Sequence, residues 1–237
     1  MWDPIHLSRE TIDGKRYYET PDGKFKSVTT ILSEVLDSSG LDAWEERIGI
    51  DEANKIRGMA ASRGRALHEM AEKYLHNEED WWKGHITTSI LQFNKVAEEL
   101  NWRVENIRLI ESQLYSAELK AAGTCDLICD FKIDNDDQDG WFFNSTLGEV
   151  EYDPYWEGHL EDCLSVVDFK TARSKVLYKA QKEKYFTQAA AYAIMAEELY
   201  EEEVPQLVIV WIREEHDPVI LSDYTDAWRE KVAEVFG

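Results

Sequence analysis

Residues 165–175 read SVVDFKTARSK, an apolar run that ends in charged side chains. Val166 and Val167 predict a buried strand. Because side chains alternate along a strand, Asp168 and Lys170 should project from one face, about 6.6 Å apart, while Phe169 points to the other. Burying either charge without a partner is costly. This segment alone leaves two interpretations open: a structural ion pair at a strand end, or a metal-binding carboxylate beside a catalytic lysine.

The apolar pattern on both sides of this strand predicts an α/β protein. Residues 15–28 should form a hairpin around the Pro-Asp-Gly turn at 21–23. Ser27 or Thr29 should cap a helix with an apolar face made of Ile31, Leu32, Val35 and Leu36. The other predicted helices cover 41–76 (broken near Gly49 and Gly58), 89–100, 179–202 and the segment from Tyr224 onward; the other strands cover 102–116, 121–133, 163–169, 206–212 and a short stretch near Val219. This order predicts one domain over residues 1–237, with a sheet flanked by helices.

Composition excludes several classes of protein. No apolar run approaches the roughly 20 residues that span a bilayer, and the opening segment resembles neither a signal nor a transit peptide. Three cysteines are too few for a disulfide framework, a four-cysteine zinc site or a four-cysteine iron–sulfur cluster. We therefore expect a soluble, cytoplasmic protein with no iron–sulfur cluster and no membrane partner.

The charge is strongly acidic but unevenly distributed. The formal net charge is −22, from 48 acidic and 26 basic residues, which as a whole repels nucleic acid. Basic side chains gather in residues 55–73 and 170–184, the second of which begins at the strand end quoted above. The acids gather elsewhere, notably in 134–139 and 148–162. A nucleic-acid strand would therefore meet two local basic segments on an acidic body.

Three further segments carry candidate site residues. Gly64, His68 and Glu72 are four apart, hence on one face of a helix. Asp126 follows Gly-Thr near the start of an apolar strand; if that strand is regular, Asp126 faces the same way as Ile128 and opposite to Cys125 and Leu127. A plain turn is the alternative interpretation of this segment.

The last of these segments is an Ala-rich helix that carries Tyr185, Gln188 and Tyr192. Their spacing puts all three on one face, where they could join helix to sheet, position a lysine or contact a nucleic-acid backbone. Carboxylate oxygens with one imidazole suit Mg²⁺ or Mn²⁺. Such an ion activates water and stabilises charge on a phosphate, and Lys170 beside it would orient the nucleophile or neutralise the developing charge.

Four segments, in order, resemble the motifs of the PD-(D/E)XK nuclease superfamily in its RecB-like branch: GRALHEMAE, AGTCDLI, VVDFKTA and QAAAYA. Two segments, YYETPDGKFKSVTTIL near the start of the chain and AASRGRALH ending at His68, more particularly resemble the mitochondrial genome maintenance exonuclease and its phage relatives. The resemblance covers about residues 17–192. It implies a restriction-endonuclease-like core, in which a central mixed β-sheet is flanked by helices. The family's Gly-Thr before the histidine is Gly64-Arg65 here.

The resemblance also implies roles for individual residues. It makes His68, Asp126, Asp168 and the carbonyl of Phe169 metal ligands, with Lys170 and Gln188 completing the catalytic group beside Asp126 and Asp168. Glu72 and Glu111 would support these ligands or bind a second metal. The DNA-binding residues expected from the family helix, the basic segments and the helix start at 27–29 are Ser27, Thr29, Arg65, Arg173, Lys175, Tyr185, Gln188 and Tyr192. Ordinary helix capping is the alternative for Ser27 and Thr29.

These features together predict a metal-dependent DNA exonuclease that uses Mg²⁺ or Mn²⁺ and favours single strands, in recombination, repair or DNA degradation. Trp44, Trp81 or Trp82 could stack on bases, with ordinary packing as the alternative. Replication or recombination proteins are expected partners, and a phage protein would act in the host cytoplasm. The alternatives are a duplex-dependent exonuclease or flap endonuclease of the same superfamily, and a non-enzymatic acidic DNA mimic. An acidic insertion at about 133–163 separates Asp126 from Asp168.

Overall fold

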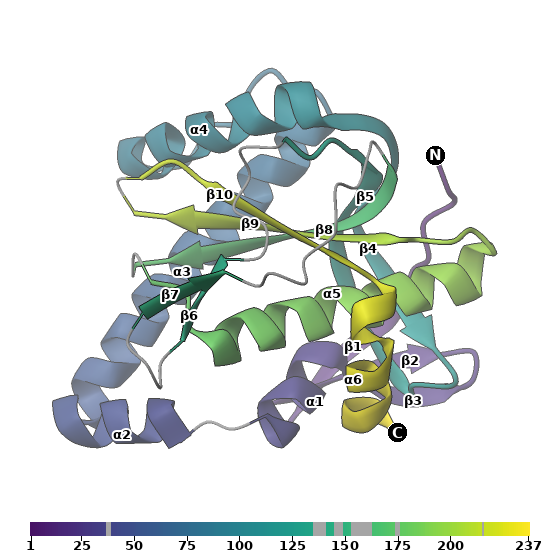
Figure 1. Ribbon diagram of the computed structural model, residues 1–237, viewed down its shortest axis with the longest axis horizontal. Helices are drawn as coiled ribbons and strands as arrows, with labels where there is room; N and C mark the ends of the chain where they lie inside the picture. Colours follow the sequence, from purple (N-terminus) through teal and green to yellow (C-terminus); the bar gives the residue numbers. More distant parts are fainter. Residues whose placement is uncertain (37–38, 135–140, 145–148, 153–162, 174–175, 215) are drawn as a thin grey trace.

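Residues 165–172 of the quoted segment lie in strand β8 (Cys163–Ala172) of an eight-stranded mixed sheet (Figure 1). A computed structural model of the chain describes residues 1–36, 39–134, 141–144, 149–152, 163–173, 176–214 and 216–237. The other strands of this sheet are β1 (Ser8–Ile12), β2 (Lys15–Thr20), β3 (Gly23–Ser27), β4 (Val104–Ser116), β5 (Ala121–Phe131), β9 (Gln206–Arg213) and β10 (Val219–Tyr224). The sheet order is β1-β2-β3-β5-β8-β9-β10, with β4 paired to β5. The predicted α/β class, with a central mixed sheet flanked by helices, is confirmed.

Strand β5 has an interrupted edge that bears on the site. Strand β4 pairs antiparallel along one side of β5. On the other side, β3 pairs in parallel with Ala121 and Ala122, whereas β8 pairs antiparallel with residues 127–131. Between these partners, residues 123–126 have no strand partner on that edge within the described chain. Strand β8 therefore pairs with β5 only at residues that follow Asp126.

Helices cover both faces of the sheet in two separate hydrophobic clusters (Figure 1). Helices α1 (Val28–Val35), α5 (Lys179–Tyr200) and α6 (Asp226–Phe236) pack on one face, where the centre of α5 is rich in buried alanine. Helices α3 (Ile50–Leu75) and α4 (Thr87–Arg103) pack on the other, while α2 (Ser39–Ile48) precedes α3. Helix α5 is also the crossover between the parallel strands β8 and β9. This arrangement brings α3 and α5 to opposite faces of β8.

The N-terminal predictions are largely confirmed. The hairpin joins β2 to β3 with Thr20 opposite Gly23. Ser27 is the N-cap of α1 and accepts a 3.1 Å hydrogen bond from the backbone N–H of Thr30. The predicted apolar face is wrong at one position, because Val35 is 54% exposed. Val35 is the last residue of this short helix.

The predicted break at Gly49 is confirmed, but the one at Gly58 is wrong. Gly49, with φ = +86°, separates α2 from α3. Helix α3 then runs unbroken through Gly58 for 26 residues. A single glycine in a helix costs only about 1 kcal/mol relative to alanine, and buried residues on both sides of Gly58, such as Ala53 and Leu67, hold the helix to the domain. Packing therefore outweighs the local propensity.

The predicted acidic insertion lies mostly outside the described residues. Within it, β6 (Trp141–Asn144) and β7 (Glu149–Tyr152) pair antiparallel as a separate two-stranded sheet. Cys125 and Cys129 are buried free thiols, and Cys163 is half-buried. Within the described chain, no helix has both the length and the apolar character needed to cross a membrane.

Gly123 should not tolerate a side chain, because α5 lies directly against it. A Cβ atom there would come within 2.7 Å of the Tyr192 ring, which is only 2% exposed and has no room to move. We expect Gly123→Ala to lower the free energy of unfolding by about 1–3 kcal/mol, as overpacking does. Urea denaturation measures this.

Gly58→Ala is the matched control, because nothing lies within 4 Å of a Cβ atom at this exposed helical position. It should raise the free energy of unfolding by about 0.5–1 kcal/mol. Equal stability of Gly123→Ala and the wild type would contradict the close packing of α5 on β5.

Candidate metal centre

Two buried carboxylates meet where β5 and β8 diverge. The last regular pair between these strands is Leu127 with Val167. Asp126 and Asp168 are each one position beyond it, and they are 7% and 1% exposed. Instead of continuing the ladder, Asp126 Oδ2 accepts a 2.8 Å hydrogen bond from the backbone N–H of Phe169. The Asp126 side chain thus takes the place of a backbone acceptor and ends the pairing.

Asp126 does not face as a regular strand predicts. Cys125 packs in the same cluster as Ile128, on the α5 face, while Leu127 packs on the α3 face. Strict alternation therefore fails between residues 125 and 128, where β5 loses its neighbour. Asp126 reaches His68 of α3, so the prediction that it shares a face with Ile128 is wrong.

His68, on α3, contacts residues of three strands, β4, β5 and β8. Its Nδ1 atom lies 3.2 Å from Oε1 of Glu111 and 3.3 Å from Oδ1 of Asp126. Its Nε2 atom lies 3.1 Å from the carbonyl oxygen of Phe169. Gly64, one turn earlier, also faces β8, because a Cβ atom there would lie 3.6 Å from Thr171 Oγ1, an ordinary van der Waals contact. The four-residue spacing of Gly64 and His68 thus puts both residues on the side of α3 that meets β8.

Glu111 joins this group through an unusual backbone conformation. It lies opposite Asp126 in the β4–β5 register, between the pairs formed by its two neighbours. Its φ of +42° is uncommon for a residue other than glycine. Such strain persists only where surrounding contacts enforce it, and it clusters at functional sites. Its carboxylate is thereby held against His68.

Lys170 and Gln188 hold the second carboxylate. Lys170 Nζ forms an ion pair with Oδ2 of Asp168. Gln188 Nε2, from α5 on the same face, donates a 3.1 Å hydrogen bond to Oδ1 of Asp168. The Lys170 ammonium also lies 5.4 Å from the centre of the Tyr185 ring. The predicted common face of Asp168 and Lys170 is confirmed, and both interpretations of the pair remain compatible with this contact.

The carboxylates around His68 set its protonation. Burial by itself would lower the pKa of His68, but Asp126 and Glu111 outweigh it and raise the pKa to about 10. Burial raises the pKa of Glu111. For Asp126, burial is outweighed by the His68 charge, by Lys170 and by the Phe169 N–H, so its pKa is lowered. At neutral pH the metal-free protein therefore holds an imidazolium between two acidic side chains.

Asp168 and Lys170 are perturbed by the same surroundings. Burial raises the pKa of Asp168 to about 6, although the Lys170 charge opposes this shift. Burial lowers the pKa of Lys170, but the charges of Asp168 and Asp126 outweigh it, so the net shift is upward. Lys170 is therefore a cation at neutral pH. Strong perturbation of several adjacent groups is typical of functional sites.

The donor set fits a divalent cation. One ligand atom each from His68, Glu111 and Asp126 lie within 4.8 Å of one another, so this group could hold a metal ion. The Phe169 carbonyl is next to His68, whereas Asp168 is held by Lys170 and Gln188 beside this group. Glu111, expected only as a supporting or second-metal residue, is therefore as close to His68 as Asp126 is. Its place depends on the β4–β5 register and on its positive φ, which no sequence motif reports.

Several residues predicted to contact DNA are buried or paired with other residues of the protein. Tyr192 is buried against Gly123, and Ser27 is 1% exposed and caps its own helix, so neither offers a surface to a substrate. Arg173 pairs with Glu214, which also binds Arg63 at 2.5 Å. Thr29, Arg65 and Glu72 are exposed, and Lys175 lies outside the described residues. Arg65 is three residues before His68 and has no ion-pair partner among the described residues.

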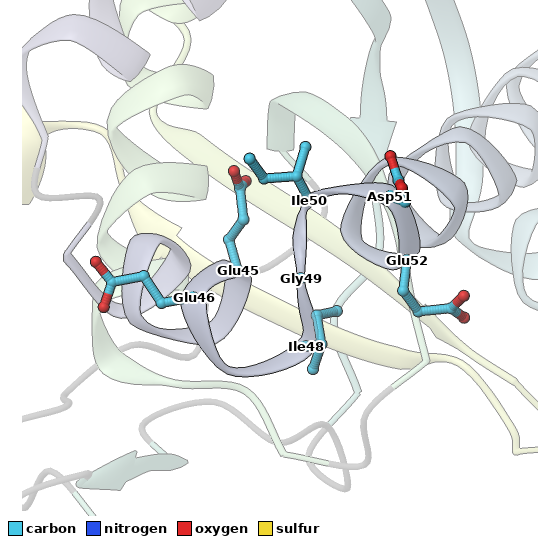
Figure 2. A pocket seen from close by; sticks show the side chains of 7 residues that line it. All are labelled: Glu45, Glu46, Ile48, Gly49, Ile50, Asp51 and Glu52. Carbon is cyan, nitrogen blue, oxygen red and sulfur yellow. The ribbon is translucent and has the colours of Figure 1, made fainter.

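The tryptophans considered for base stacking, and a surface hollow at the start of α3, do not contribute to this centre. Trp81 packs edge-on against Tyr74, and Trp44 lies 5.8 Å from the Arg57 guanidinium, so both have structural roles; Trp82 is half exposed. Figure 2 shows the hollow, at the junction of α2 and α3, lined by Glu45, Glu46, Ile48, Gly49, Ile50, Asp51 and Glu52. It lies 18 residues before His68, about 27 Å along a helix, and its acids contribute nothing to the metal centre.

Comparison with known proteins adds no assignment: no family model matches the chain, and no curated protein matches it significantly.

Metal binding should release a proton, because His68 must lose its proton to become a ligand. With the pKa of His68 raised to about 10, about one proton should leave per Mn²⁺ bound at pH 7–8, and the affinity should rise about tenfold per pH unit up to pH 9. Calorimetric titration in buffers of different ionisation enthalpy measures both quantities.

The control is His68→Gln, which should bind Mn²⁺ more weakly and release no proton. Tight binding by the wild type without proton release would show that His68 is not a ligand.

Proposed function

We propose that this protein is a metal-dependent DNA exonuclease of the PD-(D/E)XK superfamily that favours single-stranded DNA. One observation carries the proposal: the ammonium of Lys170 is held on the Asp168 carboxylate, directly beside a His–Glu–Asp group able to hold a metal ion. Hard oxygen donors with one imidazole favour Mg²⁺ or Mn²⁺. A cation and a metal site side by side suit a phosphate, which places negative charge next to both.

In this proposal the metal, when bound, activates water and stabilises negative charge on the phosphate. Asp126, Glu111 and His68 would hold it, with the Phe169 carbonyl close by. Gln188 fixes the orientation of Asp168, and Asp168 fixes that of Lys170. The chain thus presents an ordered ammonium to the reacting phosphate. Lys170 would neutralise the developing charge or orient the attacking water, with no rearrangement during the reaction.

The burial of this group argues against the acidic DNA mimic. A mimic must display its carboxylates to a partner protein, whereas Asp126 and Asp168 are 7% and 1% exposed. Replacing a buried ion pair by apolar residues often stabilises a fold. A non-catalytic protein would therefore gain little from keeping Lys170 and Asp168 in its core.

The duplex-dependent exonuclease and the flap endonuclease remain the second candidates, because they use the same site chemistry. The acidic body favours the single-strand preference: a duplex brings about twice as many phosphates per length as one strand, and each is repelled by a net charge of −22.

Lys170→Ala should abolish most of the activity while leaving metal binding in place. We expect a rate at least about 10²-fold lower, the loss typical of removing one charge-stabilising group. The assay uses end-labelled single-stranded and duplex DNA with Mn²⁺, Mg²⁺ or EDTA. Wild-type protein should shorten the single strand with either metal but not with EDTA, and the label position reveals polarity.

A thermal melt must accompany this assay, because Lys170→Ala leaves Asp168 buried without its cation and lowers stability. Lys170→Arg keeps the charge and separates lost stability from lost chemistry: it should melt closer to the wild type than Lys170→Ala and still be impaired in cleavage. Folded wild-type protein that cleaves neither substrate with either metal would overturn the proposal.

A further inference from the structure

Lys184 is a second lysine beside the site that no step above uses. It lies on α5 one turn before Gln188, so both side chains project from the same side of the helix. It is half-buried, and it follows Glu183 and precedes Tyr185, whose ring contacts Lys170. Lys184 therefore lies on the face of α5 that covers Lys170 and Asp168.

Lys184 differs from most cations of this acidic chain. Neighbouring basic residues pair with acids: Lys231 with Glu183 and Glu234, and Arg173 with Glu214. Lys184 has no ion-pair partner in the part of the chain that the structure describes. Burial lowers the pKa of Lys184, and the Lys170 charge lowers it further, so this ammonium is repelled by a neighbouring cation. Among the described residues, no anion compensates this half-buried ammonium.

A buried donor next to Lys170 points to the same requirement. Trp211 lies opposite Lys170 in the parallel β8–β9 register, and its side chain packs on the α5 face of the sheet. It is 5% exposed, and its indole N–H has no hydrogen-bond acceptor among the described residues. This face therefore carries both an uncompensated ammonium and an unused buried donor beside the same lysine.

The charge balance of the site agrees with this placement. Three carboxylates, those of Glu111, Asp126 and Asp168, surround the centre. A divalent ion and the Lys170 ammonium supply three positive charges, and a metal-bound imidazole is neutral. The Lys184 ammonium is then one positive charge in excess before any substrate phosphate binds.

We propose that Lys184 binds a phosphate of the substrate strand next to the one that is cleaved, and so fixes the register of the strand over Lys170. This inference rests on the proposed nuclease function and adds a substrate-binding residue to it. It assigns to α5 a direct contact with the nucleic-acid backbone, made by Lys184 in place of the buried Tyr192.

The test is Lys184→Gln, measured by the salt dependence of single-strand binding. The probe is a fluorescent oligothymidine with phosphorothioate linkages, which keep the negative charge and resist hydrolysis, bound in Mn²⁺ at several salt concentrations. Loss of one phosphate contact should reduce the slope of log K against log salt by about 0.7 for a single strand. Lys184→Arg should restore the slope.

Lys182→Gln is the matched control. Lys182 is two residues away on the same helix, hence about 200° around it, and its ammonium lies 5.7 Å from the Phe186 ring on the side that faces α6. Removing this equal charge should leave the slope unchanged. An uncharged methylphosphonate probe should erase the difference between wild type and Lys184→Gln.

The possible outcomes separate the two proposals. Lys184→Gln should melt no lower than the wild type, because it removes a repulsive charge; a large drop would mark Lys184 as structural and overturn the inference. Equal slopes for wild type and Lys184→Gln would also overturn the inference about Lys184. If the wild type still cleaves DNA in that case, the proposed nuclease function stands. Failure of the wild type both to bind and to cleave DNA would overturn the proposed function itself.

Discussion

The meeting of Asp126 and Asp168 is the constraint around which this end of the molecule is arranged. The β5–β8 register brings the two carboxylates to facing positions, nearly inaccessible to water. Two such charges cannot share a buried place without compensation. The Phe169 N–H and His68 compensate Asp126, while Lys170 and Gln188 compensate Asp168. These compensating groups come from three elements, β8, α3 and α5, so both helices must meet the strand at this point.

One glycine makes part of that meeting possible. Gly123 lets the Tyr192 ring of α5 lie against β5, because a Cβ atom there would come within 2.7 Å of the ring. Within the described chain, residues 123–126 have no strand partner on the edge of β5 that faces β3 and β8. A small residue, an interrupted edge and a buried ionic group are therefore parts of one arrangement, since a side chain at Gly123 would displace the Tyr192 ring.

Sequence reasoning succeeded where a side chain's direction follows from local periodicity. The common face of Asp168 and Lys170 needed only strand alternation, whereas the family resemblance was needed to group Gln188 with them. It failed where nonlocal packing decides: Gly58 stays helical because its helix is held elsewhere, and Asp126 turns toward α3 because β5 has lost its neighbour. The sequence could not show that Glu111 lies as close to His68 as Asp126 does. This contact requires a positive φ at Glu111 and a register set by another strand.

The acidity of the chain and a phosphate-binding role are compatible because they act at different distances. Surface acids act through solvent, where salt screens charges beyond roughly 8–10 Å. In the proposed function, Lys170 and Lys184 would act at contact distance in partly buried surroundings, where screening is weak and attraction to a phosphate is correspondingly stronger. A strand would thus be rejected by most of the surface and held only where its backbone reaches the two lysines. Such a body would limit nonspecific binding without weakening the site, which suits the proposed exonuclease because that activity needs a strand end and not coverage of the whole nucleic acid.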